Sequence, residues 1–142
     1  MEKECSIICL VYVQKLLDRT GLALNKFNWK RLIFITLVLG NKVWDDESFE
    51  NPNFAQAFTV FSLREIALFE MTLLGLIDYD VSVKNSEYAK QYFSLRTYSE
   101  ERNRSFPLKP LDVETVRRLQ GNADKAEQYL REAHNEALFK TL

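Results

Sequence analysis

Apolar side chains recur along the chain at the three- and four-residue spacing that is typical of amphipathic helices. Capping and breaking residues divide this pattern into separate helical segments. We expect helices over about residues 4–18, 28–44, 52–58, 62–75, 86–98 and 112–139. Before the last of them, Pro107 and Pro110 forbid regular helix and favour an extended linker over residues 99–111. The pattern therefore predicts an all-α protein, with a bundle over residues 1–98 and an extra C-terminal helix within residues 112–142.

The second helical segment is apolar on nearly all sides. Seven of the eight residues from Leu32 to Leu39 are apolar, and Trp29, Val43 and Trp44 extend the set. At about 100° per residue, these side chains cover nearly the whole circumference of a helix. A helix that is hydrophobic all round must be surrounded by others. We therefore expect it to be the central helix of the bundle.

The last helical segment carries a narrow apolar stripe at alternating spacings of three and four. Its members are Val116, Leu119, Ala123, Ala126, Leu130, Ala133 and Ala137. Because four of these seven residues are alanine, the stripe buries little area and would make a weak coiled coil. We expect this helix to lie against the body of the protein rather than against a second copy.

Charge and hydropathy exclude several classes of partner. The 142 residues include 19 Lys and Arg and 20 Asp and Glu, so the basic excess that is typical of nucleic-acid binding is absent. The longest apolar run has about half the length of a membrane-spanning helix. Glu2 and Glu4 precede the first apolar run, which argues against a signal peptide, and the start lacks the glycine needed for N-myristoylation. We expect a cytoplasmic or nuclear protein without direct membrane insertion.

Residues that could carry chemistry are few. Cys5 and Cys9 lack further ligands at zinc spacing, and we interpret them as reduced core residues. His134 stands in a polar helical stretch with nothing to make it a base. The carboxylates of residues 45–47 are ligands that hard cations prefer, but consecutive acids after a helix are usually solvated. We therefore expect no catalytic residue, no metal and no cofactor.

Two charged residues stand among apolar ones. Glu70 lies in the middle of a helical stripe formed by Leu63, Ile66, Ala67, Leu73, Leu74 and Ile77. Lys42 lies near the end of the apolar helix, where almost all of its neighbours are apolar. A carboxylate in such a place is costly unless it is paired or hydrogen-bonded. One interpretation is a salt bridge between the two residues, and the other is a partly apolar surface on which both hydrogen-bond to a partner. Periodicity alone leaves both open.

Several motifs, in order along the chain, resemble the cyclin box of cyclin Y-type proteins. They are Asn28-Trp29-Lys30-Arg31, Lys42-Val43-Trp44-Asp45-Asp46, the stretch from Glu70 to Val81, the Tyr-Ala-Lys-x-Tyr-Phe-x-Leu-Arg motif within residues 87–96, and Ser105-Phe106-Pro107-Leu108-Lys109-Pro110-Leu111. The resemblance covers roughly residues 5–119.

The resemblance implies a five-helix cyclin fold and a regulatory subunit without chemistry of its own. Such a subunit would bind and allosterically activate a cyclin-dependent kinase of the PFTAIRE or PCTAIRE class. By resemblance, Lys42 and Glu70 would hydrogen-bond to the kinase backbone beside its C-helix. The apolar positions that would pack on the same helix are Leu39, Val43, Met71, Leu74, Tyr79 and Val81.

The resemblance also leaves alternatives. A cyclin box normally begins with an earlier helix, whereas this chain starts almost inside the second one. A shortened cyclin-like scaffold or decoy, which binds a kinase without activating it, is therefore the alternative function. A cyclin-fold module that binds nucleic acid is a third, and the near-neutral charge argues against it.

Overall fold

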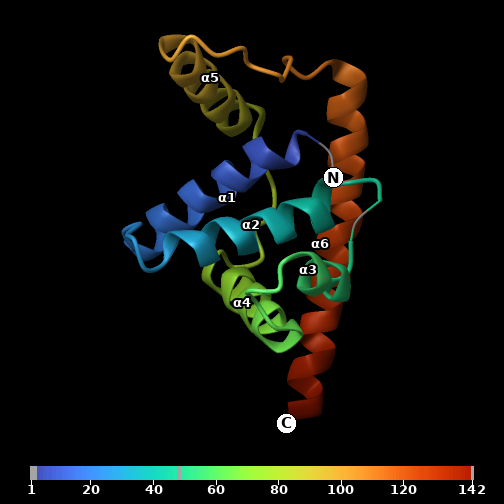
Figure 1. The fold of residues 1–142 in the computed structure, drawn as a ribbon. Helices are drawn as coiled ribbons and strands as arrows, with labels where there is room; N and C mark the ends of the chain where they lie inside the picture. The colour runs from blue at the N-terminus through green and yellow to red at the C-terminus, as the bar shows by residue number, and fades with distance from the viewer. Residues whose placement is uncertain (1–2, 48, 142) are drawn as a thin grey trace.

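The computed structural model describes residues 3–47 and 49–141, without the side chains of His134 and residues 137–141 (Figure 1). Over this part the chain forms helices joined by loops, which confirms the expected all-α class. The helices are α1 (Cys5–Thr20), α2 (Trp29–Trp44), α3 (Asn51–Ala57), α4 (Leu63–Leu76), α5 (Asn85–Glu101) and α6 (Val113–Thr141). None of them is long and apolar enough to span a bilayer.

The central position expected for the apolar helix is confirmed. Figure 1 shows α2 in the middle of the molecule, with α1 and α4 on either side and α6 across its C-terminal end. Nine residues of α2 are buried: Phe34, Ile35, Thr36, Val38, Leu39, Gly40, Asn41, Val43 and Trp44. The N-terminal turn is less covered, since Trp29 is 46% exposed. The helix is thus surrounded along its C-terminal two-thirds only.

The two cysteines join α1 to α2. Cys5 and Cys9 are both buried. The thiol of Cys9 lies 3.0 Å from the hydroxyl of Thr36, and that of Cys5 lies 3.8 Å from the carbonyl oxygen of Gly40. Burial raises the pKa of the Cys9 thiol, partly offset by the Thr36 hydrogen bond. Both side chains therefore act as small core residues, as the sequence predicts.

Helix α5 ends at Glu101, later than the expected end at residue 98. An i,i+4 ion pair between Arg96 and Glu100 stabilises the additional turn. The helix then stops in a left-handed residue, Asn103, with φ of 53°, and the amide of Arg104 donates to the carbonyl oxygen of Ser99 at 3.0 Å. This is the Schellman ending of a helix. The extended linker accordingly begins only after this cap.

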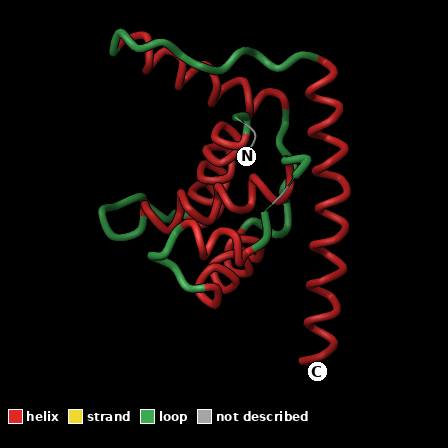
Figure 2. Tube along the Cα trace, turned by 45° about the vertical axis from the view of Figure 1, so that its right-hand side comes forward, coloured by secondary structure: helices red, strands yellow, loops and turns green. Residues whose placement is uncertain are grey.

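Helix α6 lies against one side of the bundle, reached by the extended linker that crosses from α5 (Figure 2). Leu119 and Ala123 are buried in the main core, and Ala126 and Leu130 are partly buried against it. Ala133 is exposed, and the side chain of the next stripe residue is not among those described. The stripe therefore directs α6 onto the body of the protein only as far as Leu130.

Candidate functional site

Lys42 and Glu70 form an ion pair between α2 and α4. The ammonium of Lys42, in the last turn of α2, lies 2.9 Å from Oε1 and 2.7 Å from Oε2 of Glu70. Their side chains are 21% and 11% exposed, so the pair lies at the edge of the core. The hydrophobic periodicity of the sequence left open whether these two residues form a salt bridge, and the structure contains that salt bridge. Both charged groups are also partly exposed at the surface.

Asn51 is a third member of this site, which the sequence did not single out. Its side-chain amide, at the start of α3, donates to Oε2 of Glu70 at 3.2 Å. Its own Oδ1 is buried and accepts no hydrogen bond from the described residues. An asparagine at the start of a helix is common in any protein, so only the fold reveals that α3 brings it to Glu70. The site therefore joins α2, α3 and α4.

The apolar residues named by the resemblance fall into two groups. Most are buried within this chain: Leu39 is 0% exposed, Val43 1%, Val81 1% and Leu74 5%. Met71 is 61% exposed, and Tyr79 is half-buried. The structure thus brings the two charges together and leaves Met71 at the surface. The other residues contribute mainly to the core.

Residues 77–82, which we call the exit segment, follow α4 in an unusual conformation. Asp78 and Tyr79 have φ values of 53° and 55°, in the left-handed region that residues other than glycine seldom occupy. The hydroxyl of Tyr12, on α1, donates to the carbonyl oxygen of Val81 at 2.8 Å and accepts from Nε1 of Trp44 at 2.7 Å. The exit segment is therefore held to α1 and α2 by a buried hydrogen-bond chain.

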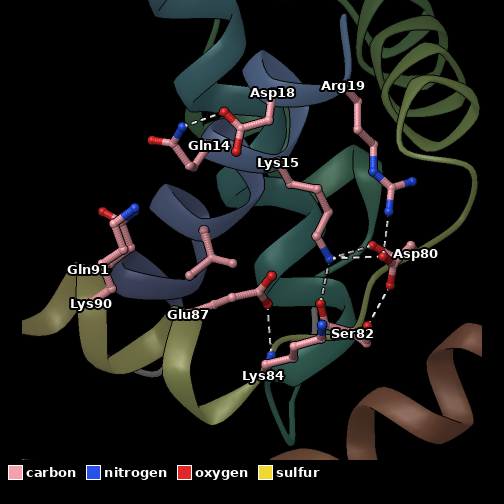
Figure 3. A pocket seen from close by; sticks show the side chains of 11 residues that line it. Gln14, Lys15, Asp18, Arg19, Asp80, Ser82, Lys84, Glu87, Lys90 and Gln91 are labelled. Carbon is pink, nitrogen blue, oxygen red and sulfur yellow. Dashed lines mark hydrogen bonds and ion pairs between the residues drawn. The ribbon is translucent and has the colours of Figure 1, made fainter.

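A polar hollow of about 330 Å³ lies between α1, the exit segment and α5, and its charged groups hold that segment (Figure 3). Lys15 donates to the carbonyl oxygens of Ser82 at 2.7 Å and Asp80 at 3.1 Å. Arg19 donates to the carbonyl oxygen of Ile77 and to the carboxylate of Asp80, both at 2.6 Å. Both cations are therefore engaged with backbone and carboxylate oxygens of the exit segment. These contacts hold Tyr79 and Val81 in position.

Two members of the acidic run after α2, Asp45 and Asp46, make contacts within the fold. Asp45 is 9% exposed, and its carboxylate accepts from the side-chain amide of Asn41 at 2.9 Å. Asp46 accepts from the side-chain amide of Asn122 at 2.7 Å and forms an ion pair with Arg118. The expectation of a solvated run is therefore wrong for Asp45, because α2 ends in a turn that folds this carboxylate inward. No cluster of metal-ligating side chains occurs within the described residues.

Comparison with protein-family models identifies a family for this chain. The protein-family model described as Cyclin matches residues 1–90. This range contains Lys42, Asn51, Glu70 and the whole exit segment, and it ends inside α5. No solved structure matches the chain. The family assignment therefore rests on the part of the chain that forms the candidate site, and α6 lies outside the matched range.

Proposed function

The chain belongs to the cyclin family, whose members are regulatory subunits rather than enzymes, and we propose that it binds and allosterically activates a cyclin-dependent kinase of the PFTAIRE or PCTAIRE class. The Lys42–Glu70 pair is the observation that carries the proposal. The choice of kinase class rests on the motifs in residues 87–96 and 105–111, which resemble cyclin Y-type proteins. We call the residues that the resemblance assigns to the kinase contact the docking face, which includes buried residues beneath the exposed ones: Leu39, Lys42, Val43, Glu70, Met71, Leu74, Tyr79 and Val81.

The ion pair retains capacity for further hydrogen bonds. An ammonium has three donors, and Glu70 engages Lys42 through two contacts. The carboxylate has about four acceptor positions and receives Lys42 and Asn51. A backbone carbonyl and a backbone amide of a partner helix could therefore bind on opposite sides of the pair. Charge-assisted hydrogen bonds of this kind fix the register of a partner on an otherwise apolar surface.

The proposed mechanism is a shift of the kinase population. A protein kinase positions the ATP phosphates only when a glutamate of its C-helix pairs with the lysine of strand β3. A rigid surface that fits the C-helix only in that position favours the active conformation by its differential affinity. The hydrogen bonds at Lys15, Arg19 and Tyr12 support such a surface, because they hold the exit segment against α1.

Activity and binding of a purified PFTAIRE-class kinase, titrated with this protein, test the proposal. The parent should activate the kinase, and Lys42→Glu and Glu70→Ala should each lose both binding and activation. Arg64→Glu is the matched control, since Arg64 is an exposed charge on the same helix as Glu70. Circular dichroism on every variant separates a lost contact from a lost fold.

A charge swap separates docking from internal support. The double variant Lys42→Glu/Glu70→Lys restores an ion pair between α2 and α4 but inverts the charges presented to the kinase. If the pair contacts the kinase, the swapped protein folds and fails to bind. Recovery of binding by the swap would assign the pair to internal support alone. Binding by the parent without activation would instead make the protein a scaffold or decoy.

A further inference from the structure

The last helix of the same chain borders the docking face at the C-terminal end of α2. Val43 and Val81 are each 1% exposed and belong to the same core cluster as Leu119 and Ala123 of α6. Figure 1 shows α6 running past the C-terminal end of α2, where Lys42 and Val43 lie. A partner helix that packs beside Val43 would meet α6 at this end of α2, where Asn122 donates to the carbonyl oxygen of Trp44.

Polar contacts fix α6 in this position. The side-chain amide of Asn122 donates to the carbonyl oxygen of Trp44 at 3.1 Å and to the carboxylate of Asp46 at 2.7 Å. Arg118, one turn earlier on α6, forms an ion pair with the same carboxylate. The first of these contacts caps the carbonyl of Trp44 at the end of α2, which lacks a partner within its own helix.

Further along, α6 approaches the exit segment. Burial raises the pKa of the Tyr79 hydroxyl, and the charge of Arg131 on α6 acts in the opposite direction. Leu130, the neighbouring stripe residue, is partly buried against the core. Helix α6 therefore runs from the end of α2 toward Tyr79, which are two separate parts of the docking face.

The packing of α6 against the rest of the bundle is weak enough for this helix to detach. The α6 stripe contributes two alanines and two leucines over residues 119–130, so it buries less apolar area than a helix of the main core. The pair between Arg118 and Asp46 is exposed, and exposed pairs contribute little to stability. Two leucines, two alanines and a few hydrogen bonds hold α6, whereas α1, α2 and α4 share most of the large buried residues.

We propose that α6 is an intramolecular cover of the docking face, which must move away before a kinase helix can pack on the C-terminal end of α2 and on Tyr79. This inference rests on the proposed function, because the kinase helix is the competing occupant. Lys42, Glu70 and Met71 remain accessible while α6 is in place, so a kinase can make its first contact there. The apparent affinity for the kinase then equals the intrinsic affinity multiplied by the fraction of molecules in which α6 is open.

Weakening the cover should strengthen kinase binding. The double variant Arg118→Ala/Asn122→Ala removes the polar contacts of α6 and leaves every core side chain in place. We expect the apparent Kd for a purified PFTAIRE-class kinase to fall about three- to ten-fold. Arg117→Ala is the matched control, since Arg117 is the exposed neighbour of Arg118. The control should bind as the parent does.

Hydrogen exchange of the full chain supplies the second measurement. In the free parent the amides of residues 113–131 should be protected, and kinase addition should remove this protection while α2 keeps its own. Unprotected α6 amides in the free chain would overturn the cover directly. Unchanged protection of α6 in the complex, with equal affinity for parent and double variant, would overturn the cover and leave the proposed function intact. Absence of kinase binding by every folded variant would overturn the proposed function, and the cover with it.

Discussion

The ammonium of Lys42 lies within 2.9 Å of both carboxylate oxygens of Glu70, yet the two side chains are not equally covered. Lys42 is 21% exposed and has a long flexible stem, whereas Glu70 is 11% exposed and is held on α4 beside α3. If the pair is broken, the ammonium can turn toward water more readily than the carboxylate can. The two partners therefore contribute differently to stability.

Lys42→Met should destabilise the protein more than Glu70→Gln. We expect roughly 2–3 kcal/mol for Lys42→Met, because the carboxylate of Glu70 is left with Asn51 and little water, and about 1 kcal/mol for Glu70→Gln. Urea unfolding at neutral pH measures both. The double variant should cost less than the sum, since no uncompensated charge remains. Equal costs for the single variants would contradict this asymmetry. Arg64→Met, at an exposed position, is the control.

Tyr12→Phe should destabilise the protein by roughly 2–4 kcal/mol. The change removes one hydroxyl and leaves two buried groups without partners, the indole N–H of Trp44 and the carbonyl oxygen of Val81. Thermal unfolding followed by tryptophan fluorescence measures the effect. Tyr98→Phe should be close to neutral, because Tyr98 is 54% exposed. A neutral Tyr12→Phe would mean that water or a rearranged exit segment replaces the lost hydroxyl.

Glycine replacements on two helices should separate packing from helix propensity. A Cβ at Gly75 meets no atom within 4 Å, so Gly75→Ala should stabilise α4 by up to about 1 kcal/mol. A Cβ at Gly40 lies 3.5 Å from the carbonyl oxygen of Cys5 and 3.6 Å from Ile8, which is ordinary contact, so Gly40→Ala should also stabilise. Gly40→Leu should destabilise, because α1 leaves no room for a longer side chain. Chemical denaturation of the three variants checks the ranking.

The helices could be predicted from the sequence because the hydrophobic periodicity, the capping residues and the helix-breaking residues indicated the same boundaries. Ser62 and Glu65 form the capping box at the start of α4, with the side chain of Ser62 accepting from the amide of Glu65 at 3.2 Å. The exit segment could not be predicted in the same way. Asp78 and Tyr79 adopt a left-handed backbone, and the amide of Tyr79 donates to the carbonyl oxygen of Leu74 at 2.9 Å in a Schellman-type ending of α4. Neither residue is the glycine that usually marks such an ending in a sequence.

The candidate site was predictable only where a residue broke a pattern. Lys42 and Glu70 were conspicuous because each is a charge within an apolar stripe. Asn51 broke no pattern, and its role depends on the path of the chain between α2 and α4. The stripe on α6 predicted that this helix packs on the body of the protein, but a stripe carries no information about which face it covers. That information lies in the tertiary partners of Arg118 and Asn122.

The anchoring of α6 should weaken in acid through Asp46. Hydrogen bonds from Asn122 and then from Arg118 hold the pKa of the Asp46 carboxyl below its usual value. A carboxyl whose pKa is lower in the folded state stabilises the fold above its ordinary pKa of about 3.9 and loses this contribution as the pH falls through the folded value. We therefore expect the side-chain amide resonances of Asn122 to shift toward those of an unanchored α6 below about pH 4.

Asp46→Asn isolates this group from the other carboxyls that titrate in the same range. Hydrogen bonds from backbone amides at the starts of α4 and α6 also lower the pKa of the Glu65 and Asp112 carboxyls. The parent will therefore show more than one transition in acid. In Asp46→Asn the Asn122 resonances should already lie near their acid positions at neutral pH and should move little on acidification, since the amide keeps an acceptor but carries no charge. Identical acid profiles for the parent and Asp46→Asn would show that the contact between Asp46 and α6 contributes nothing to its anchoring.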